Sequence, residues 1–258
     1  MSPTGAMETA VAVHNRDGHG PALVVCEHAS NRIPARYDGL GLPAGLLDSH
    51  IAWDPGALPV AQGISAALDA PLVAGGLSRL LFDCNRPPEA PDAIPARSEI
   101  HDIPGNCTLT PREREARIAG IHNPFRDALQ TVLAGFAAPP VIVTVHSFTP
   151  VYRGVPRDVE IGLIHDSDDR LTAAMMGCAG DHTDRRLRVN DPYGPQDGVT
   201  HSLRAHALPI NAPNVMLEIR NDLIRDLRSQ VAMASMLARW IADACTDLGV
   251  TLPVAAPT

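Results

Sequence analysis

The chain has 258 residues, a formal net charge of −8 at pH 7 and 45% hydrophobic residues. This length suits one large domain, and because no Pro-, Gly- or Ser-rich stretch divides it, we expect a single domain over residues 1–258 with loose ends at about 1–18 and 251–258. The acidic balance and the lack of basic clusters interleaved with aromatic residues argue against a nucleic-acid partner. No apolar run approaches the roughly 20 residues needed to cross a bilayer, and the N-terminus has neither a basic start nor an apolar signal core, so we expect a cytoplasmic protein without a membrane partner.

Apolar runs of strand length alternate with longer segments of helical period along the chain. This alternation predicts an α/β fold in which helices cover a sheet. Several runs are apolar at consecutive positions, so both faces of the sheet should be covered. The predicted strands are residues 22–28, 70–75, 79–84, 140–146, 159–165, 185–190 and 214–220.

Two helices have clear signals at their ends. A capping box at Thr110 and Glu113, with proline between them, predicts a helix from residue 110 to about 136 that is kinked near Pro124. A second helix, over roughly residues 226–248, stops at a glycine and should pack on the core through one stripe. That stripe consists of Val231, Ala234, Leu237, Ile241, Ala244 and Leu248.

The loops over residues 27–43 and 84–107 are long and poor in residues that could build a core. Long loops in compact domains are usually functional, and both of these leave the carboxyl end of a predicted strand, the edge where α/β sheets commonly bind ligands.

Polar residues gather at the ends of four predicted strands. If these strands are neighbours, one crevice would hold imidazoles, a carboxylate and a guanidinium, which suits metal-assisted hydrolysis of an anionic substrate. The residues at the four strand ends are Glu27 and His28, Asn85 and Arg86, His146 and Ser147, and Glu218 and Arg220.

Each of these residues also has a purely structural interpretation. A single histidine among 11 is more often structural, so the prediction that His28 and His146 bind Zn²⁺ depends on their occurring together beside a carboxylate. Glu218 is either a general base whose pKa is raised by burial or the partner of an arginine such as Arg220. Arg86 either holds a substrate carboxylate or pins a loop.

Two aspartates and the five cysteines complete the set of candidates. Asp54 and Asp83 are each a possible helix cap, arginine partner or oxygen ligand. The cysteines are odd in number and have no C-x-x-C spacing, which argues against a disulfide framework and a thiolate zinc cage, so we expect most of them to be reduced and inert. No G-x-S-x-G, G-x-G-x-x-G or P-loop motif is present.

The ordered motifs resemble the N-formylglutamate amidohydrolase family. They are VVCEHASNRIP, HIAWDPGA, LSRLLFDCNRPP, GIHNPFRDAL, VIVTVHSFTPVY and VMLEIRNDL. That family in turn resembles the zinc carboxypeptidases, which implies a three-layer α/β/α domain with a mostly parallel mixed sheet, of the phosphorylase/hydrolase-like type. The resemblance implies a zinc-dependent amidohydrolase that cleaves N-formyl-L-glutamate to formate and glutamate in histidine degradation.

The resemblance also implies roles for individual residues. His28 and His146 would bind Zn²⁺, and Glu218 would be the catalytic base. Carboxypeptidases have a glutamate ligand three residues after the first histidine, where this chain has an asparagine. The third ligand is therefore expected to be Asp54, with Glu27 and Asn31 as alternatives.

The substrate implied by the resemblance is a small anionic N-acyl amino acid. Asn85, Arg86 and Ser147 would contact it, and a second arginine, Arg153, would hold its second carboxylate. Two other functions stay open: a zinc hydrolase of another N-acyl amino acid or of a peptide C-terminus, and a non-catalytic domain that binds a metal or an anion. The sequence does not predict an oligomeric state.

Overall fold

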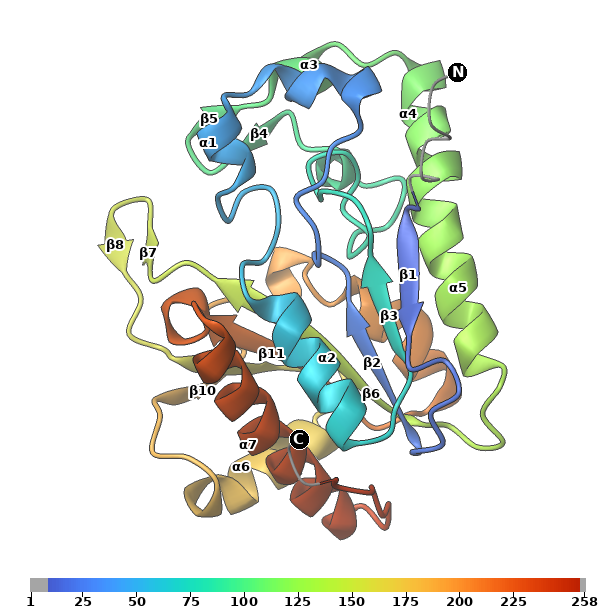
Figure 1. Cartoon of the computed structure of the whole chain (residues 1–258), viewed down its shortest axis with the longest axis vertical. Coiled ribbons are helices and arrows are strands. Elements are labelled where there is room, and N and C mark those ends of the chain that lie inside the picture. The colour runs from blue at the N-terminus through green and yellow to red at the C-terminus, as the bar shows by residue number, and fades with distance from the viewer. Residues whose placement is uncertain (1–8, 256–258) are drawn as a thin grey trace.

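The computed structural model describes residues 9–255 and contains a seven-stranded sheet (Figure 1). The strand order is β1-β3-β2-β6-β11-β9-β10, and neighbouring strands are parallel except in the pairs β1–β3 and β11–β9. The strands are β1 (Val11–His14), β2 (Ala22–Cys26), β3 (Leu72–Gly75), β6 (Val141–Phe148), β9 (Ile161–Ile164), β10 (Leu187–Val189) and β11 (Asn214–Arg220). The predicted mostly parallel mixed sheet is confirmed.

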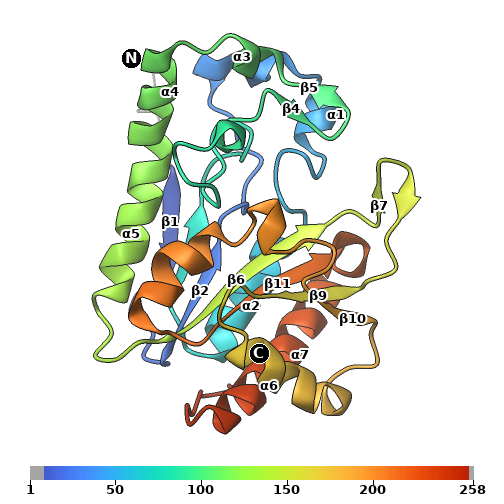
Figure 2. The ribbon, with the colours of Figure 1, turned by 180° about the vertical axis from the view of Figure 1, so that it is seen from behind.

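Helices cover both faces of this sheet. On one face, α2 (Ala57–Ala67), α6 (Arg170–Cys178) and α7 (Leu227–Asp247) bury a large apolar cluster with alternate residues of the strands (Figure 1). The opposite face is covered by α5 (Asn123–Leu133) and by the segment around residues 203–212 (Figure 2). The fold is therefore a three-layer α/β/α arrangement, as predicted.

The helix predicted from residue 110 exists, but it is not uniform. Its capping box is formed, because the Glu113 N–H donates to Thr110 Oγ1 at 3.3 Å and the Thr110 N–H donates to Glu113 Oε2 at 2.8 Å. Helix α4 (Pro111–Arg117) is followed by a π-helical turn at residues 118–122 and then by α5. Pro124 has no N–H to donate, so the widened turn lies where we expected a kink.

The second predicted helix, α7, has the expected ends. Asp226 Oδ1 accepts the Ser229 N–H at 2.8 Å, and Gly249 follows the helix with a φ of 74°. The predicted apolar stripe packs on the core except at Val231, which is 46% exposed and lies near the start of the helix.

The structure corrects the sequence prediction at three places. Residues 79–84 form turns, although Leu80, Leu81 and Phe82 are buried, because an apolar run shows burial but does not by itself select strand geometry. Strand β1 lies inside the N-terminal segment that we expected to be loose. At the other end, Leu252 is buried and the Ala255 N–H donates to Ala67 O at 2.8 Å.

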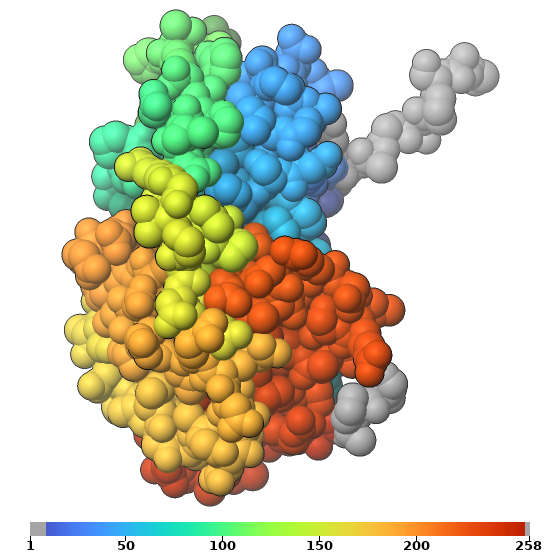
Figure 3. Space-filling model, turned by 90° about the vertical axis from the view of Figure 1, so that its left-hand side faces the viewer, coloured from blue at the N-terminus to red at the C-terminus, as the bar shows by residue number. Residues whose placement is uncertain are grey.

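Short elements lie in the loops above the sheet. They are α1 (Ala44–Leu47), α3 (Pro104–Cys107), the paired strands β4 (Arg97–Ser98) and β5 (His101–Asp102), and the hairpin of β7 (Val151–Tyr152) and β8 (Val155–Pro156). Figure 3 shows that hairpin (yellow) between the green and blue loops above it and the orange and red segments below it. Within residues 9–255, no helix combines the length and apolar character of a membrane span.

Candidate active site

Three segments of the chain bring the candidate ligands together. His28 follows β2, and His146 lies in β6, which is parallel to β2. Asp54 lies in the turn before α2, and its N–H donates to the carbonyl oxygen of His28 at 3.0 Å. Because parallel strands present their carboxyl ends at one edge, both histidines reach the same cleft. All three residues are at least 97% buried.

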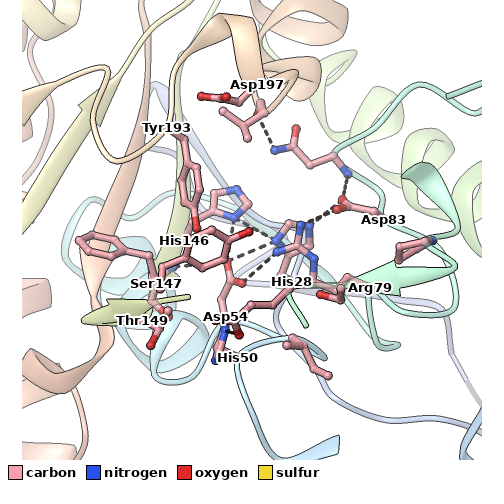
Figure 4. A pocket seen from close by; sticks show the side chains of 18 of the residues that line it. His28, His50, Asp54, Arg79, Asp83, His146, Ser147, Thr149, Tyr193 and Asp197 are labelled. Carbon is pink, nitrogen blue, oxygen red and sulfur yellow. Dashed lines mark hydrogen bonds and ion pairs between the residues drawn. The ribbon is translucent and has the colours of Figure 1, made fainter. Parts of the chain in front are cut away.

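These three side chains form a compact set of metal-ligand donors (Figure 4). Nδ1 of His28, Nδ1 of His146 and a carboxylate oxygen of Asp54 belong to a group whose ligand atoms lie within 4.8 Å of one another. Asp54 Oδ2 is 3.3 Å from His28 Nδ1 and 2.9 Å from His146 Nδ1. Two imidazoles and one carboxylate are the donor set of many catalytic zinc sites.

A carboxylate lies beside the far nitrogen of each imidazole ring, as a hydrogen bond at His28 and as a close ion pair without hydrogen-bond geometry at His146. His28 Nε2 is 2.7 Å from Asp83 Oδ1, and His146 Nε2 is 3.1 Å from Glu27 Oε2. Arg79 donates to Asp83 Oδ2 at 2.6 Å and to Asp54 Oδ1 at 3.5 Å. Such contacts orient a ligand histidine and fix which nitrogen is free to bind a metal. Glu27 is thus a partner of a candidate ligand in this structure.

The other alternative ligand lies outside the cluster. Asn31 uses its amide to donate to Leu47 O at 3.0 Å and to Asp48 Oδ1 at 3.1 Å. Of the three residues considered for the third ligand position, Asp54 is the one that the structure places beside both histidines.

The electrostatics of the cluster follow from burial and pairing. Burial raises the pKa of the Asp54 carboxyl, but the neighbouring His28 and His146 outweigh it and leave that pKa below its usual range. Burial lowers the pKa of His146, but Glu27 and Asp54 raise it well above its usual value. A cation that binds these imidazoles must therefore displace protons, so metal binding should strengthen as pH rises.

Glu218 lies next to this cluster on β11. It is paired with His146 in the parallel β6–β11 register, so both side chains point to the sheet face opposite α2 and α7. Burial raises the pKa of Glu218 to about 7. Its Oε2 atom is buried without a hydrogen-bond partner among the described residues.

The salt bridge that we considered between Glu218 and Arg220 is not formed. Arg220 donates to Asp222 Oδ1 at 2.8 Å and lies 3.7 Å from Glu160. A buried carboxyl with an oxygen that lacks a hydrogen-bond partner is costly, and buried groups with raised pKa values occur preferentially at functional sites.

The Asn85 and Arg86 pair does not follow a strand, because residues 79–84 form turns. Both amide atoms of Asn85 are engaged, since Nδ2 donates to Val199 O at 2.6 Å and Oδ1 accepts the Ser202 N–H at 3.0 Å. Arg86 donates to Asp92 Oδ2 at 2.9 Å and to the carbonyl oxygen of Gly198. Together they fasten the segment over residues 198–202 to the wall of the cleft.

Ser147 is also engaged with the protein. Its hydroxyl donates to Pro55 O at 2.8 Å, and its N–H donates to Asp54 Oδ2 at 3.3 Å. These bonds hold the turn that carries Asp54 against the end of β6.

A cleft of about 660 Å³ opens above these residues, and its lining includes Asp54, Glu218 and two arginines of the β7–β8 hairpin region. Arg153 is exposed at the tip of the hairpin. Arg157 is half-buried, and its guanidinium carbon lies 4.6 Å from the ring centre of Tyr152 and 4.8 Å from that of Tyr193.

Arg157 and Tyr193 were not identified from the sequence. Burial raises the pKa of Tyr193 to about 12, so its hydroxyl stays protonated and able to donate a hydrogen bond. Neither residue belongs to a motif, and only the tertiary fold brings the two together with the end of β6. Arg79 lies in the LSRLLFDCNRPP motif, but no local pattern marks it as the partner of Asp54 and Asp83.

A buried donor set for a metal ion lies beside a buried carboxyl that has one oxygen without a hydrogen-bond partner, in a cleft at the carboxyl edge of an α/β sheet. Such a site is typical of a hydrolase. The chain belongs to the N-formylglutamate amidohydrolase family, whose sequence model matches residues 20–225. The suspected resemblance is thereby confirmed.

Two solved structures share this fold. A gene product of Agrobacterium tumefaciens is 50% identical over 93% of this chain and 96% of its own, with a TM-score of 0.91. An N-formylglutamate amidohydrolase from Ralstonia eutropha is 17% identical over 90% of this chain and 98% of its own, with a TM-score of 0.58, which shows a shared fold. No curated protein matches the chain.

Proposed function

We propose that this protein is a zinc-dependent amidohydrolase that cleaves the N-formyl amide of an acidic amino acid, most specifically N-formyl-L-glutamate, to formate and glutamate. The observation that carries the proposal is that the buried carboxyl of Glu218 lies beside the cluster of His28, Asp54 and His146. Burial raises the pKa of this carboxyl to about 7. Because this substrate is an intracellular metabolite of histidine degradation, we place the activity in the cytoplasm.

The three clustered residues fit the proposed metal. Each offers one donor atom, these atoms lie within 4.8 Å of one another, and the remaining ring nitrogens of His28 and His146 face carboxylates. Zn²⁺ bound there would polarise the formyl carbonyl and lower the pKa of a water molecule to roughly 7. No thiolate takes part, so Zn²⁺ or another divalent metal that accepts imidazole and carboxylate suits the site.

Glu218 would supply the proton transfers. As a carboxylate it accepts the proton of the attacking water, and as a carboxylic acid it then donates that proton to the departing amide nitrogen. A pKa near 7 suits both steps at neutral pH. The C–N bond breaks while a C–O bond forms, and the net reaction consumes one water.

Recognition of the substrate requires cations that the protein does not already neutralise. Arg157 meets this requirement best, because its polar contact to Thr149 O is long, at 3.5 Å, and its other contacts are with aromatic rings. We assign it one substrate carboxylate. Arg86 is paired with Asp92 through Nε and donates to Gly198 O through Nη1, so it meets this requirement less well, but its Nη2 is left for the second carboxylate.

The remaining substrate-binding predictions change with the structure. We propose that Asn85 and Ser147 position the wall of the cleft, since both side chains are engaged by backbone groups. Arg153, exposed at the tip of the hairpin, is assigned a weaker role in attracting the anion.

The test compares Glu218→Gln with the wild type after chelation and reloading with Zn²⁺. Release of glutamate should fall by about 10²- to 10⁴-fold in Glu218→Gln, the usual contribution of a general base, while the zinc content stays at the wild-type level. Glu115→Gln, at an exposed position on α4, is the matched control and should keep full activity. A near-normal rate in zinc-loaded Glu218→Gln would remove the proposed base.

The same assay separates the other functions. N-acetyl-L-glutamate, N-succinyl-L-glutamate and a peptide with a C-terminal glutamate serve as alternative substrates for the zinc-loaded protein. A higher kcat/KM for one of them would replace the proposed substrate within the same reaction class. No turnover of any of them by folded, zinc-loaded protein would favour a non-catalytic binding domain.

A further inference from the structure

A second group of metal-ligand donors lies on the face covered by α6 and α7. It consists of Cys178, His182 and Asp243, whose ligand atoms lie within 4.8 Å of one another. Cys178 is the last residue of α6, His182 follows the short 3₁₀ turn after that helix, and Asp243 lies on α7. None of the three lines the cleft of the candidate active site.

The imidazole of this group is held in place. Its ring stacks on the buried Trp240, with 6.3 Å between ring centroids and an interplanar angle of 22°. The Trp240 indole is itself fixed, because Nε1 donates to Met175 O at 2.7 Å. His182 Nε2 lies 3.1 Å from Asp243 Oδ2, so the imidazole already faces the carboxylate.

The thiol is half-buried and reaches the same point. Cys178 Sγ lies 3.4 Å from the carbonyl oxygen of Ala174 and 3.6 Å from that of Met175, both one turn earlier in α6. These are weak interactions that a sulfur atom gives up readily. A metal ion could therefore replace the thiol proton without breaking a strong contact.

A cysteine, a histidine and an aspartate in contact could also suggest a nucleophile with its base. Burial raises the pKa of the Cys178 thiol, and Asp243 raises it further, whereas an activated cysteine needs a lowered pKa. The negative field that disfavours a free thiolate attracts a cation. The arrangement therefore suits metal binding better than nucleophilic catalysis.

We propose that Cys178, His182 and Asp243 form a second metal site, separate from the active site, for a thiophilic divalent cation of the Zn²⁺ class. One thiolate, one imidazole and one carboxylate are ordinary ligands of Zn²⁺, with water in the fourth position. Binding forms an S–metal bond and releases the thiol proton to solvent. The bound ion would link the end of α6 to α7 and stabilise the folded chain in proportion to ln(1 + [metal]/Kd).

The test uses Cd²⁺, added to the zinc-loaded protein, as a spectroscopic probe. A Cd²⁺–thiolate bond gives a charge-transfer band in the ultraviolet, and the three residues proposed for the active site contain no thiol, so the band reports a cysteine site. We expect the band to saturate at one equivalent of Cd²⁺ in the wild type. It should be absent in Cys178→Ser and unchanged in Cys107→Ser, a control at an exposed cysteine elsewhere.

The other two ligands are tested by the affinity of the same band. His182→Gln and Asp243→Asn should each weaken Cd²⁺ binding by about tenfold or more, with circular dichroism showing that the fold is retained. Asp243 is 55% exposed, so its replacement is not expected to disturb packing. Absence of the band in the wild type, its persistence in Cys178→Ser, or unchanged affinity in both of the other variants would overturn the proposal.

Discussion

Replacing Glu218 by glutamine should stabilise the metal-free protein at alkaline pH while it removes activity. The carboxyl is 95% buried, and burial raises its pKa to about 7 from an ordinary value of 4.5. His146, His28 and Arg79 lower this pKa, and Asp54 raises it, but burial has the largest effect. The side chain therefore destabilises the fold whenever it is ionised.

The size of the effect follows from the difference in pKa. Each pKa unit corresponds to about 1.4 kcal/mol, so 2.5 units between unfolded and folded protein amount to about 3 kcal/mol. The folded state holds the proton more tightly. The stability that depends on the protonated carboxyl is therefore fully present below pH 4.5, is lost as pH rises toward 7, and stays absent above that value. A glutamine has no such dependence.

The assay is urea unfolding of metal-free wild type and Glu218→Gln at pH 5 and pH 8. The variant should gain about 2 to 3 kcal/mol of unfolding free energy relative to the wild type between the two values. Comparing the two proteins cancels most of the titration of the other groups, and Glu115→Gln should show no such change. A difference between variant and wild type that is the same at both pH values would refute the reasoning.

Two further predictions concern the site, and a third concerns Gly162 of β9, which pairs with Glu218 in the β9–β11 register. Asp83→Asn removes the negative charge that lies 2.7 Å from His28 Nε2, so the zinc affinity measured by competition with a chelator should fall by about 10- to 100-fold. An unchanged zinc affinity would contradict the role of Asp83 in orienting His28. Arg157→Gln should raise KM for N-formyl-L-glutamate by about 10- to 100-fold with little change in kcat, because that factor corresponds to the loss of a hydrogen bond to a charged group. Arg153→Gln is the control. An equal rise in KM in that variant would mean that both arginines only attract the anion through their charge. Gly162→Ala places a Cβ 2.3 Å from the backbone carbonyl oxygen of Asp191, so the free energy of unfolding should fall by about 1 to 3 kcal/mol, measured by thermal unfolding. An unchanged melting temperature would mean that the backbone shifts to make room for the methyl group.

The candidate site residues that the sequence predicted and that the structure brings into one cleft carry local signals. His28 and His146 end apolar runs, and Glu218 interrupts one, so each stands out against its immediate neighbours. The capping box at Thr110 is likewise contained within four residues. Periodicity and capping act over a few residues, and for this reason they also predicted most of the strands and the two main helices.

The failures came where a decision depended on distant contacts. Residues 79–84 have the composition of a strand, but no sheet neighbour is available to them, and their apolar side chains are buried in turns. Strand β1 was missed because it is short and polar at its end, and its stability comes from pairing with β3 some 60 residues away along the chain.

The sequence by itself determined the class of the fold and the family to which the chain belongs, and it singled out the histidines and the glutamate that we propose for the site. The sequence favoured Asp54 as the third ligand, and the tertiary structure placed Asp54, and not Asn31, beside both histidines. Only the tertiary structure separated Arg220 from Glu218 and brought Arg157 to the cleft. The physical reason is that ligand choice and pKa depend on distances of 3 to 4 Å between residues far apart in the chain, such as His28 and His146, which are separated by 118 positions. No local pattern encodes such a distance, because it is set by the packing of the whole sheet.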